Sequence, residues 1–257
     1  MCSNIFRYYH TVKYLKTSQI IARVNRQVKK IFKNREKYSI RRFDSVPRIN
    51  FIANHLRAGY TKNSYRGGTF FTFLNLTFDT KGSWFPGAAD QLWIYNLHYF
   101  DYLFDCKELD GTFLIVDWID NVPVGANNAW HPYTLSLRIC NWIWNFERLT
   151  HGKSESWQIK VLNSLRNQIE YLTDNIELDV VGNHLIENCK ALIVGGSFFL
   201  DELLIDKGLR ILEKELKEQV LPDGGHYERS PMYHCIVLED LISIIDCLRG
   251  CNRPIPG

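Results

Sequence analysis

The sequence lacks the cysteine patterns that build disulfide frameworks and zinc sites. Its seven cysteines are odd in number and scattered, and no C-x-x-C pair occurs among Cys2, Cys106, Cys140, Cys189, Cys235, Cys247 and Cys251. Several of them fall on apolar helical stripes, so we expect reduced, buried thiols. Glycine and proline are also scarce, at 16 and 8 of 257 residues, and 46% of the residues are hydrophobic. This composition excludes a disordered chain and predicts one large folded domain or two modest ones.

Long apolar runs are missing as well. The first thirty residues contain no continuous apolar core of the kind that a signal peptide needs, and no stretch is long enough to cross a bilayer. The sequence therefore predicts no export signal and no membrane span, which makes the cytoplasm the default compartment.

Charge is distributed unevenly along the chain. Residues 1–42 hold 12 of the 31 lysines and arginines and a single acidic residue, Glu36, so this segment carries +11 while the remainder carries −8. Such an arm could bind nucleic acid or an anionic membrane. No aromatic stacking platform or base-reading motif accompanies the charge, so we do not expect nucleic acid as a partner. The favoured interpretation is an amphipathic helix whose basic side chains form the solvated face and whose apolar stripe consists of Ile20, Val24, Val28 and Ile31.

The pattern divides the chain into a basic helical arm with its connection (1–60) and a larger domain (61–257). Residues 69–79 are β-prone, with Leu74, Leu76 and Phe78 alternating. Beyond the following loop, apolar residues recur at i, i+3/i+4 and i+7. This spacing predicts helices with one buried face over about 97–106, 112–120, 134–149, 160–173, 184–200, 207–220 and 231–249.

Short connections between these helices make consecutive helices antiparallel neighbours. The first, third, fifth and seventh helices then point the same way, and their N-termini share one rim. The residues at or just before these N-termini are Asn96, His98, His131, Asn183, His184, Tyr233 and His234. Helix N-termini carry unsatisfied N–H groups and the positive end of the helix dipole, so this rim suits an anion.

The segment DGGHYERSPMYH (223–234) leads into the last predicted helix. Asp-Gly-Gly ends the preceding helix in a turn, and a Ser-Pro pair provides an N-cap followed by proline at the first helical position. Tyr233 therefore falls in the first turn, where the helix dipole and the nearby Arg229 and His234 favour phenolate and lower the pKa below its usual value of about 10. Tyr233 is thus a candidate proton-transfer group. On local sequence alone, a structural tyrosine is the somewhat commoner explanation.

The segment GNHLIEN (182–188) opens the fifth predicted helix. Asn183 suits a helix cap, which is the favoured explanation on local sequence. The alternative is that its amide N–H binds a substrate carboxylate. Glu187 lies one turn further along and is placed to orient His184 or Arg229.

Two aromatic segments offer further polar groups. LWIYNLHYFDY (92–102) contains Asn96, His98 and Tyr99, and WHPY (130–133) contains His131. Aromatic residues interspersed with Asn and His suit a saccharide groove, where ring faces stack on sugars. Aromatic packing between helices explains the same pattern equally well.

Taken together, the strings YNLHYFDY, WHPYTLSLRI, GNHLIEN and DGGHYERSPMYH, in this order and at these separations, resemble the N-terminal domain of heparinase II/III-like and alginate-lyase-like polysaccharide lyases. The opening YYHTVKYLKTSQIIARV is similar to the same group. The resemblance implies an all-α fold, an incomplete (α/α) toroid of antiparallel helix pairs, carrying an N-terminal basic helical arm and a short β-prone segment.

The resemblance also implies a reaction, the β-elimination of uronic-acid-containing polysaccharides such as heparan- or alginate-like polymers. A base removes the proton on C5 of the uronate, the 4-O-linked sugar departs, and the substrate carboxylate must be neutralised. By resemblance, Asn183 is the neutralising donor and Tyr233 the general acid and also the base. The residues implied to contact substrate are Asn96, His98, Tyr99, His131, His184, Glu187, His226, Arg229 and His234. No cofactor is needed, and no H-E-x-x-H or similar metal-ligand spacing occurs.

The chain departs from the family at its C-terminal end. The family continues into a β-sandwich that closes over the toroid and supplies another catalytic histidine, whereas this sequence stops at Gly257. We therefore expect an exposed apolar flank, with self-association or a separate β-sandwich as partner. The alternative to a lyase is a truncated, non-catalytic module that binds glycan or another subunit. Members of the family are commonly periplasmic, and some accompany exopolysaccharide assembly.

Overall fold

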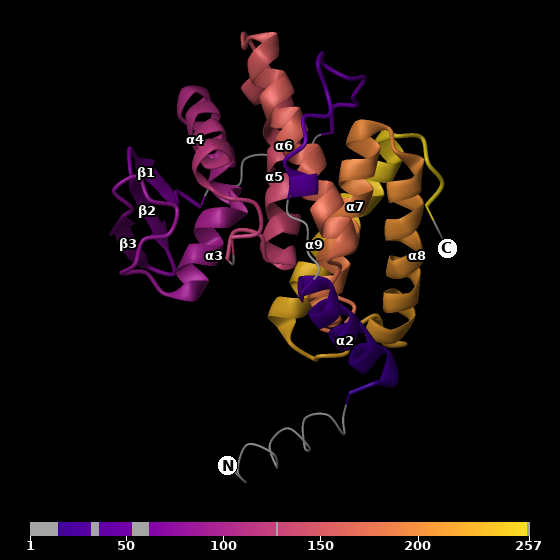
Figure 1. Ribbon diagram of the computed structural model, residues 1–257. Helices are drawn as coiled ribbons and strands as arrows, with labels where there is room; N and C mark the ends of the chain where they lie inside the picture. The colour runs from indigo at the N-terminus through magenta and orange to yellow at the C-terminus, as the bar shows by residue number, and fades with distance from the viewer. Residues whose placement is uncertain (1–14, 32–35, 53–61, 127, 256–257) are drawn as a thin grey trace.

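The computed structural model describes residues 15–31, 36–52, 62–126 and 128–255, and this part of the chain is mostly helical (Figure 1). Helix α2 (Thr17–Ile31) comes first, and a small three-stranded sheet separates it from the remaining helices. These are α3 (Gln91–Tyr99), α4 (Glu108–Asn121), α5 (Pro132–Thr150), α6 (Glu155–Asp174), α7 (Gly182–Phe199), α8 (Glu202–Gln219) and α9 (Pro231–Gly250).

The helices form two layers. In one layer α3 packs on α5, α5 on α7, and α7 on α9. In the other, α4 contacts both α5 and α6, α6 contacts α5 and α7, and α8 packs on α7. Helices that alternate along the sequence therefore lie side by side, as expected for part of an (α/α) toroid. The predicted all-α fold class is confirmed.

Helix α7 lies at the centre of the packing. Every residue from Leu185 to Phe198 is buried, which is typical of a helix surrounded by others on all sides. Helix α8 approaches it closely at Gly208, where an added Cβ would lie 2.7 Å from Ile193 Cγ1 and 3.0 Å from the carbonyl oxygen of Cys189. Only glycine permits this separation, so α8 is held tightly against α7.

A buried arginine ties several elements to α5. The Nε of Arg138 donates to Gln168 Oε1 on α6 at 2.8 Å, and its Nη1 donates to the carbonyl oxygens of Ala129 at 2.7 Å and His98 at 3.3 Å. The guanidinium carbon lies 4.1 Å from the centre of the Trp118 ring on α4. One side chain thus fixes the end of α3, the segment before α5, and the faces of α4 and α6.

The predicted helix over 97–106 is wrong. Helix α3 begins earlier, because the carboxylate of Asp90 accepts a hydrogen bond from the amide of Trp93 and caps the helix there. It ends at Phe100, whose φ of 62° lies in the left-handed region, and a 3₁₀ turn (Asp101–Phe104) follows. The other six predicted helices are confirmed, with ends that differ by a few residues.

The β-prone segment is part of a small antiparallel sheet. Its strands are β1 (Tyr65–Gly67), β2 (Phe70–Phe73) and β3 (Leu76–Asp79). The expected alternation of Leu74, Leu76 and Phe78 along one strand is wrong, because Leu74 and Asn75 adopt φ values of 52° and 62° and form a two-residue hairpin turn. Phe71 and Phe73 supply the buried face instead.

Helix α2 is confirmed as amphipathic, but its orientation is the reverse of the one expected. Arg26 Nη1 lies 3.1 Å and Arg23 Nε 3.8 Å from the carboxylate of Asp179, so the basic face meets the body of the protein. Val24 and Val28 of the apolar stripe are exposed. The carboxylate of Asp179 is itself buried, and pairing it with arginine is the physical reason for this orientation.

The connection after α2 lies against the helical layers. The amide of Asn50 donates to the carbonyl oxygen of Phe198 at 2.8 Å, and Asn163 Oδ1 accepts from the amide of Phe43 at 2.9 Å. The proposed domain boundary at residue 60 falls outside the described residues and stays a prediction.

An apolar groove of about 220 Å³ separates α8 from α9, and its walls include Leu209, Leu212, Leu216, Leu241, Ile244 and Leu248. It lies on the flank where the sequence predicts apolar exposure, and self-association there stays a prediction. Within the described ranges, none of the helices has both the length and the apolar character required to cross a bilayer.

The bonds made by Arg138 lead to a test of the fold. We expect Arg138→Lys to lower the free energy of unfolding by about 2–4 kcal/mol, because lysine cannot make the forked set of bonds and leaves buried carbonyl groups unpaired. Urea denaturation followed by circular dichroism measures the change. Arg210→Lys, on the exposed face of α8, is the matched control and should stay within about 0.5 kcal/mol of the original chain. Equal stability of the two variants would contradict the assigned role.

Candidate active site

Three of the four predicted helix N-termini meet at one end of the layers. They belong to α5, α7 and α9, and we call this region the rim, defined by His131, residues 181–184 and residues 226–234. The fourth, α3, is different, because Asn96 and His98 lie towards its C-terminal end. The structure therefore corrects the expectation that these two residues stand at a helix start.

A buried carboxylate joins the starts of α5 and α7. Glu177 Oε1 lies 3.2 Å from His184 Nδ1 in the first turn of α7 and 3.7 Å from Nε2 of His131, the N-cap of α5. The ring of Tyr133 lies over His184 with 4.3 Å between ring centres. Glu177 is completely buried, and Asn188 Nδ2 donates to its second oxygen at 3.3 Å. Two predicted substrate residues are thus brought together and oriented by a glutamate that the sequence did not single out.

Asn183 is not the helix cap that local sequence favours. Helix α7 begins at Gly182 and its N-cap is Val181, which provides no side-chain bond. Asn183 lies in the first turn and is largely buried, and across the described residues its amide has no hydrogen-bond partner. The amide is therefore available to a ligand.

The backbone before Asn183 is strained. Val181 adopts a φ of 58° and a ψ of −154°, a conformation that β-branched residues rarely occupy. Such strain costs on the order of 1–3 kcal/mol and persists only where surrounding contacts enforce it. Here the side chains of Tyr227 and Glu228 lie over the next residue, with Tyr227 Oη and Glu228 Oε1 3.5 and 3.4 Å from the position of a Cβ on Gly182. The two motifs of the sequence are therefore in contact.

Gln219 fixes this contact. Its Nε2 donates to the carbonyl oxygen of Gly182 at 3.1 Å, which leaves its Oε1 facing His226 Nε2 at 3.1 Å. His226 Nε2 must then carry the hydrogen, and the buried Nδ1 is left without a partner in the described structure. Burial lowers the pKa of His226. His226 is therefore a neutral imidazole with an unused acceptor nitrogen.

The start of α9 is as predicted. Ser230 is the N-cap and proline occupies the first helical position. Tyr233 is half-buried in the first turn, and its hydroxyl makes no bond to any described residue. Arg229 and His234 beside it are exposed, and Arg229 has a φ of 52° in the turn that leads into the helix. This end of α9 thus presents a phenol and two basic side chains that form no hydrogen bond or ion pair within the described part of the chain.

A cavity of about 220 Å³ lies between α3, α5, α7 and α9. Its lining includes three predicted substrate residues, Asn96, Tyr99 and Glu187, together with Tyr133, Lys190 and Asp240. Burial raises the pKa values of Tyr99 and Tyr133, so both phenols keep their protons and act as hydrogen-bond donors. The cavity therefore offers donors to an oxygen-rich ligand.

Three buried charges form one wall of this cavity. Lys190 Nζ donates to Asp240 Oδ1 at 2.6 Å and to Glu187 Oε2 at 3.0 Å, and all three side chains are almost fully buried. Burial and the neighbouring Glu187 raise the pKa of Asp240 to about 8. Burial alone would lower the pKa of Lys190, but the two carboxylates raise it above its usual value. The triad therefore holds one lysine cation and one shared extra proton near neutral pH.

His98 is not brought to the rim. It is fully buried, its Nδ1 accepts a hydrogen bond from Trp118 Nε1 at 3.0 Å, and its ring packs 5.1 Å from that of Phe85. Burial, with Arg138 nearby, holds its pKa well below the usual value. In this structure His98 is a neutral packing residue of the core.

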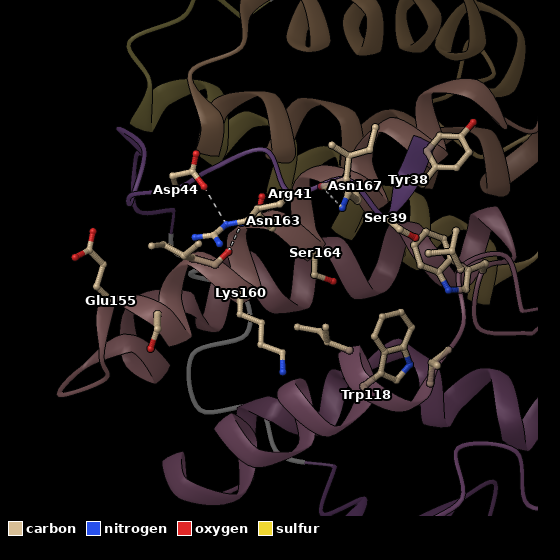
Figure 2. Close-up of a pocket in the computed structure, with 17 residues that line it drawn as sticks. Tyr38, Ser39, Arg41, Asp44, Trp118, Glu155, Lys160, Asn163, Ser164 and Asn167 are labelled. Carbon is tan, nitrogen blue, oxygen red and sulfur yellow. Dashed lines mark hydrogen bonds and ion pairs between the residues drawn. The ribbon is translucent and has the colours of Figure 1, made fainter. Parts of the chain in front are cut away.

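A larger cavity of about 740 Å³ lies elsewhere, between residues 38–44, α4 and α6 (Figure 2). None of the predicted site residues lines it. Its charged side chains are engaged with other groups, as Arg41 pairs with Asp44 at 3.1 Å and Lys160 with Asp120 at 2.6 Å. This cavity is therefore large, but its charged side chains are already paired. The rim is the better candidate site.

Sequence reasoning missed Glu177, Lys190 and Asp240. Lys190 and Asp240 were detectable in principle, because each is a charge within an otherwise apolar helical pattern. Glu177 lies in an irregular segment before α7, and no local pattern marks it. In the described portion of the chain, no group of three or more His, Cys, Asp or Glu side chains is arranged to hold a metal ion.

Comparison with known proteins identifies a family and several relatives that this chain resembles. Residues 92–254 match the family described as the heparinase II/III N-terminus. A heparin-sulfate lyase of Pedobacter heparinus is 29% identical over 147 residues, which cover 53% of this chain and 22% of that protein. A heparin-sulfate lyase of Bacteroides thetaiotaomicron is 28% identical over 134 residues, covering 48% of this chain and 19% of that protein.

A third relative has a different kind of name. FtsZ-localized protein C of Caulobacter vibrioides is 30% identical over 172 residues, which cover 63% of this chain and 29% of that protein. The chain thus spans less than a third of the length of each of these relatives. No solved structure matches it.

The buried triad predicts effects of very different size for two substitutions. Lys190→Met leaves two buried carboxylates without a cation and should lower the free energy of unfolding by about 3–5 kcal/mol. Asp240→Asn keeps an oxygen to accept from Lys190 and is neutral, as the protonated Asp240 is at pH 7, so its effect at that pH should stay below about 1 kcal/mol. Urea denaturation of both variants measures this, and similar losses in the two would contradict a charged Lys190 beside a protonated Asp240.

The same triad predicts a pH dependence. The pKa of Asp240 is about 8 in the folded chain and about 4 when unfolded. The folded state therefore binds more protons between these values, so the contribution of Asp240 to stability is full below pH 4 and is lost as the pH rises through 8. We expect Asp240→Asn to flatten the decline in stability over this window. Parallel pH profiles for the variant and the original chain would refute the assignment.

Proposed function

The chain belongs to the heparinase II/III N-terminal family, and on this premise we propose that it acts on a uronic-acid-containing polysaccharide by β-elimination. The observation that carries the proposal is a pair of polar groups at the rim, the amide of Asn183 and the hydroxyl of Tyr233. Neither forms a hydrogen bond with a described residue. They stand in the first turns of α7 and α9, two helices that pack side by side (Figure 1).

The reaction sets the demands on the first of these groups. Removal of the C5 proton spreads negative charge into the uronate carboxylate, and that charge must be neutralised as it develops. We assign this task to the Asn183 amide, which is polar, largely buried and without a hydrogen-bond partner among the described residues. The N-terminus of α7 adds backbone N–H groups and the positive end of the helix dipole.

The second demand is proton transfer. Tyr233 lies in the first turn of α9 beside the exposed Arg229 and His234, and no residue that the structure describes forms a hydrogen bond with its hydroxyl. We assign it the general acid role, protonating the departing 4-O-linked sugar, and also the role of base toward C5. His226, a neutral imidazole with an unpaired nitrogen, lies in the turn before it and is proposed to bind the substrate.

The remaining substrate contacts are assigned from where each residue lies relative to the rim and the cavity. His131 and His184, oriented by Glu177, are proposed to bind the substrate at the rim, with Arg229 and His234 opposite. Asn96, Tyr99 and Glu187 are proposed to line the sugar site through the cavity between the helices. His98 is left out of this set because it is enclosed by aromatic rings.

The names of two relatives support the substrate class. Both are heparin-sulfate lyases, and we propose a heparan-type uronate polymer as the first substrate to test. The name of the Caulobacter relative refers to localisation with FtsZ and to no reaction. It supports a second candidate function, a non-catalytic module that binds glycan or a protein subunit.

Turnover and its loss test the lyase proposal. The purified chain is incubated with heparan sulfate and with alginate, and the absorbance of unsaturated uronate ends is followed in the ultraviolet. We expect Asn183→Ala to lower the rate by about 100- to 1000-fold through lost charge stabilisation. Tyr233→Phe should lower it by about 100- to 10,000-fold through lost proton transfer.

Matched controls separate chemistry from folding. Asn121→Ala at the exposed end of α4 and Tyr65→Phe on β1 make the same changes away from the rim and should keep full activity. Circular dichroism checks that all four variants are folded. Undiminished turnover in either rim variant would refute its role, and glycan binding without turnover in the folded chain would favour the second candidate.

A further inference from the structure

Two cysteines lie at the C-terminal end of α9. Cys247 is in the last turn of the helix and is buried, and Cys251, the C-cap, is half-buried. Residues four apart on a helix lie on the same face, so the two side chains are neighbours. The buried state that the sequence predicts is confirmed for Cys247 but not for Cys251, whose side chain is open to solvent in part.

Three donors converge on the sulfur of Cys251. The thiol of Cys247 hydrogen-bonds to it, and Asn50 Nδ2, from the connection after α2, donates to it at 3.3 Å. The third donor is Ser197 near the end of α7, whose buried hydroxyl interacts with both sulfurs and has no hydrogen-bond partner elsewhere among the described residues. Groups from three separate parts of the chain are thus directed at one sulfur atom.

These donors favour the thiolate form of Cys251. The hydrogen bond from Cys247 has the largest effect, and together with the other two donors it lowers the pKa of Cys251 below its usual value. Burial, the carboxylate of Glu202 and the C-terminal end of the helix dipole oppose the thiolate, and the donors outweigh them. For Cys247, the hydrogen bond to Cys251 and burial raise the pKa. One sulfur is therefore a nucleophile while the other keeps its proton.

The other described cysteines lack this combination of access and donors. Cys106, Cys140 and Cys189 are buried, and burial raises the pKa of Cys106 and Cys189. Cys235 is exposed, but no described residue donates a hydrogen bond to its sulfur. Reactive cysteines are accessible and have a stabilised thiolate, and of the described cysteines Cys251 meets both conditions.

We propose that Cys251 is a peroxide-reactive thiol and that Cys247 resolves its oxidised form as a disulfide. The Cys251 thiolate attacks one oxygen of the peroxide, an S–O bond forms as the O–O bond breaks, and the departing oxyanion takes up a proton. The product is a sulfenic acid. The Cys247 thiol then attacks the sulfur of this acid, an S–S bond forms, the S–O bond breaks, and water leaves with the thiol proton. The two electrons that the sulfurs lose reduce the peroxide.

The end of the helix allows this bond to form. Residues four apart advance by about 6 Å along a helix, within the range of Cα separations that disulfides bridge. Their Cβ atoms are about 5–6 Å apart and must approach to about 4 Å. Cys251 follows the last residue of α9, so a change in its own backbone angles supplies this movement without unwinding the helix. The proposal is independent of the activity assigned to the rim, because Tyr233 lies at the opposite end of α9.

Peptide mapping of the full chain tests the proposal. Trypsin cuts after Arg249, between the two cysteines, so a Cys247–Cys251 disulfide joins two tryptic peptides that are separate in the reduced chain. The reduced chain is treated with hydrogen peroxide, the remaining thiols are blocked, and digests with and without reductant are compared by mass spectrometry. We expect the joined peptides after peroxide treatment and their separation by the reductant.

Variants separate the two steps. Cys247→Ser keeps a hydrogen-bond donor beside Cys251 but cannot form the disulfide, so oxidation should stop at the sulfenic acid, which dimedone traps at Cys251. Cys251→Ser should give neither product. Cys235→Ser makes the same change at an exposed thiol near the start of α9 and is the matched control, which should form the disulfide as the original chain does. Circular dichroism checks that each variant is folded.

Two kinds of result would overturn the proposal. The first is a folded original chain that gives no joined peptides, or one in which Cys247 pairs with its neighbour Cys140 in place of Cys251. The second is dimedone labelling of Cys235 ahead of Cys251 in Cys247→Ser, because reactivity would then follow exposure and not the donors.

Discussion

The guanidinium of Arg138 is a buried charge surrounded by carbonyl oxygens and indole rings, and no carboxylate among the described residues pairs with it. The planar guanidinium fixes the directions of its N–H groups. The end of α3, the segment before α5 and the face of α6 must therefore each place a hydrogen-bond acceptor along one of these directions. That requirement fixes where α5 begins. His131 and Tyr133, which meet α7 across the rim, follow within a few residues of Ala129, so the geometry of the candidate site is set by this buried charge.

The candidate site itself contains more buried charge than an ordinary helical interface. Glu177 orients two imidazole rings, while Glu187, Lys190 and Asp240 form a triad beneath the cavity. Buried ions are costly unless they are fully paired, so their presence on the same helices as Asn183 and Tyr233 indicates a function beyond stability. The strained backbone at Val181 lies at the same end of α7 as these groups. Rigid surroundings, together with polar groups that have no hydrogen-bond partner among the described residues, indicate a preorganised binding site.

The arm and the site are connected through one short segment. Asp179 holds α2, and Glu177, two residues before it, holds His131 and His184. The contact that orients α2 and the contact that orients the two rim histidines therefore lie within three residues of each other.

Local patterns in the sequence were enough to determine the helical class, six of the seven predicted helices and the proline start of α9, because each depends on interactions within a few residues. They also brought the GNHLIEN and DGGHYERSPMYH segments to the same rim through the alternation of antiparallel helices. The extent of α3, the burial of His98, the carboxylate between His131 and His184, and the outward stripe of α2 were decided only by tertiary structure. Each of these depends on a partner far along the chain, as Asp179 does for Arg26 and Trp118 for His98. Hydrophobic periodicity identifies which face of a helix is apolar, but the contacts that the opposite face makes determine whether that apolar face is buried.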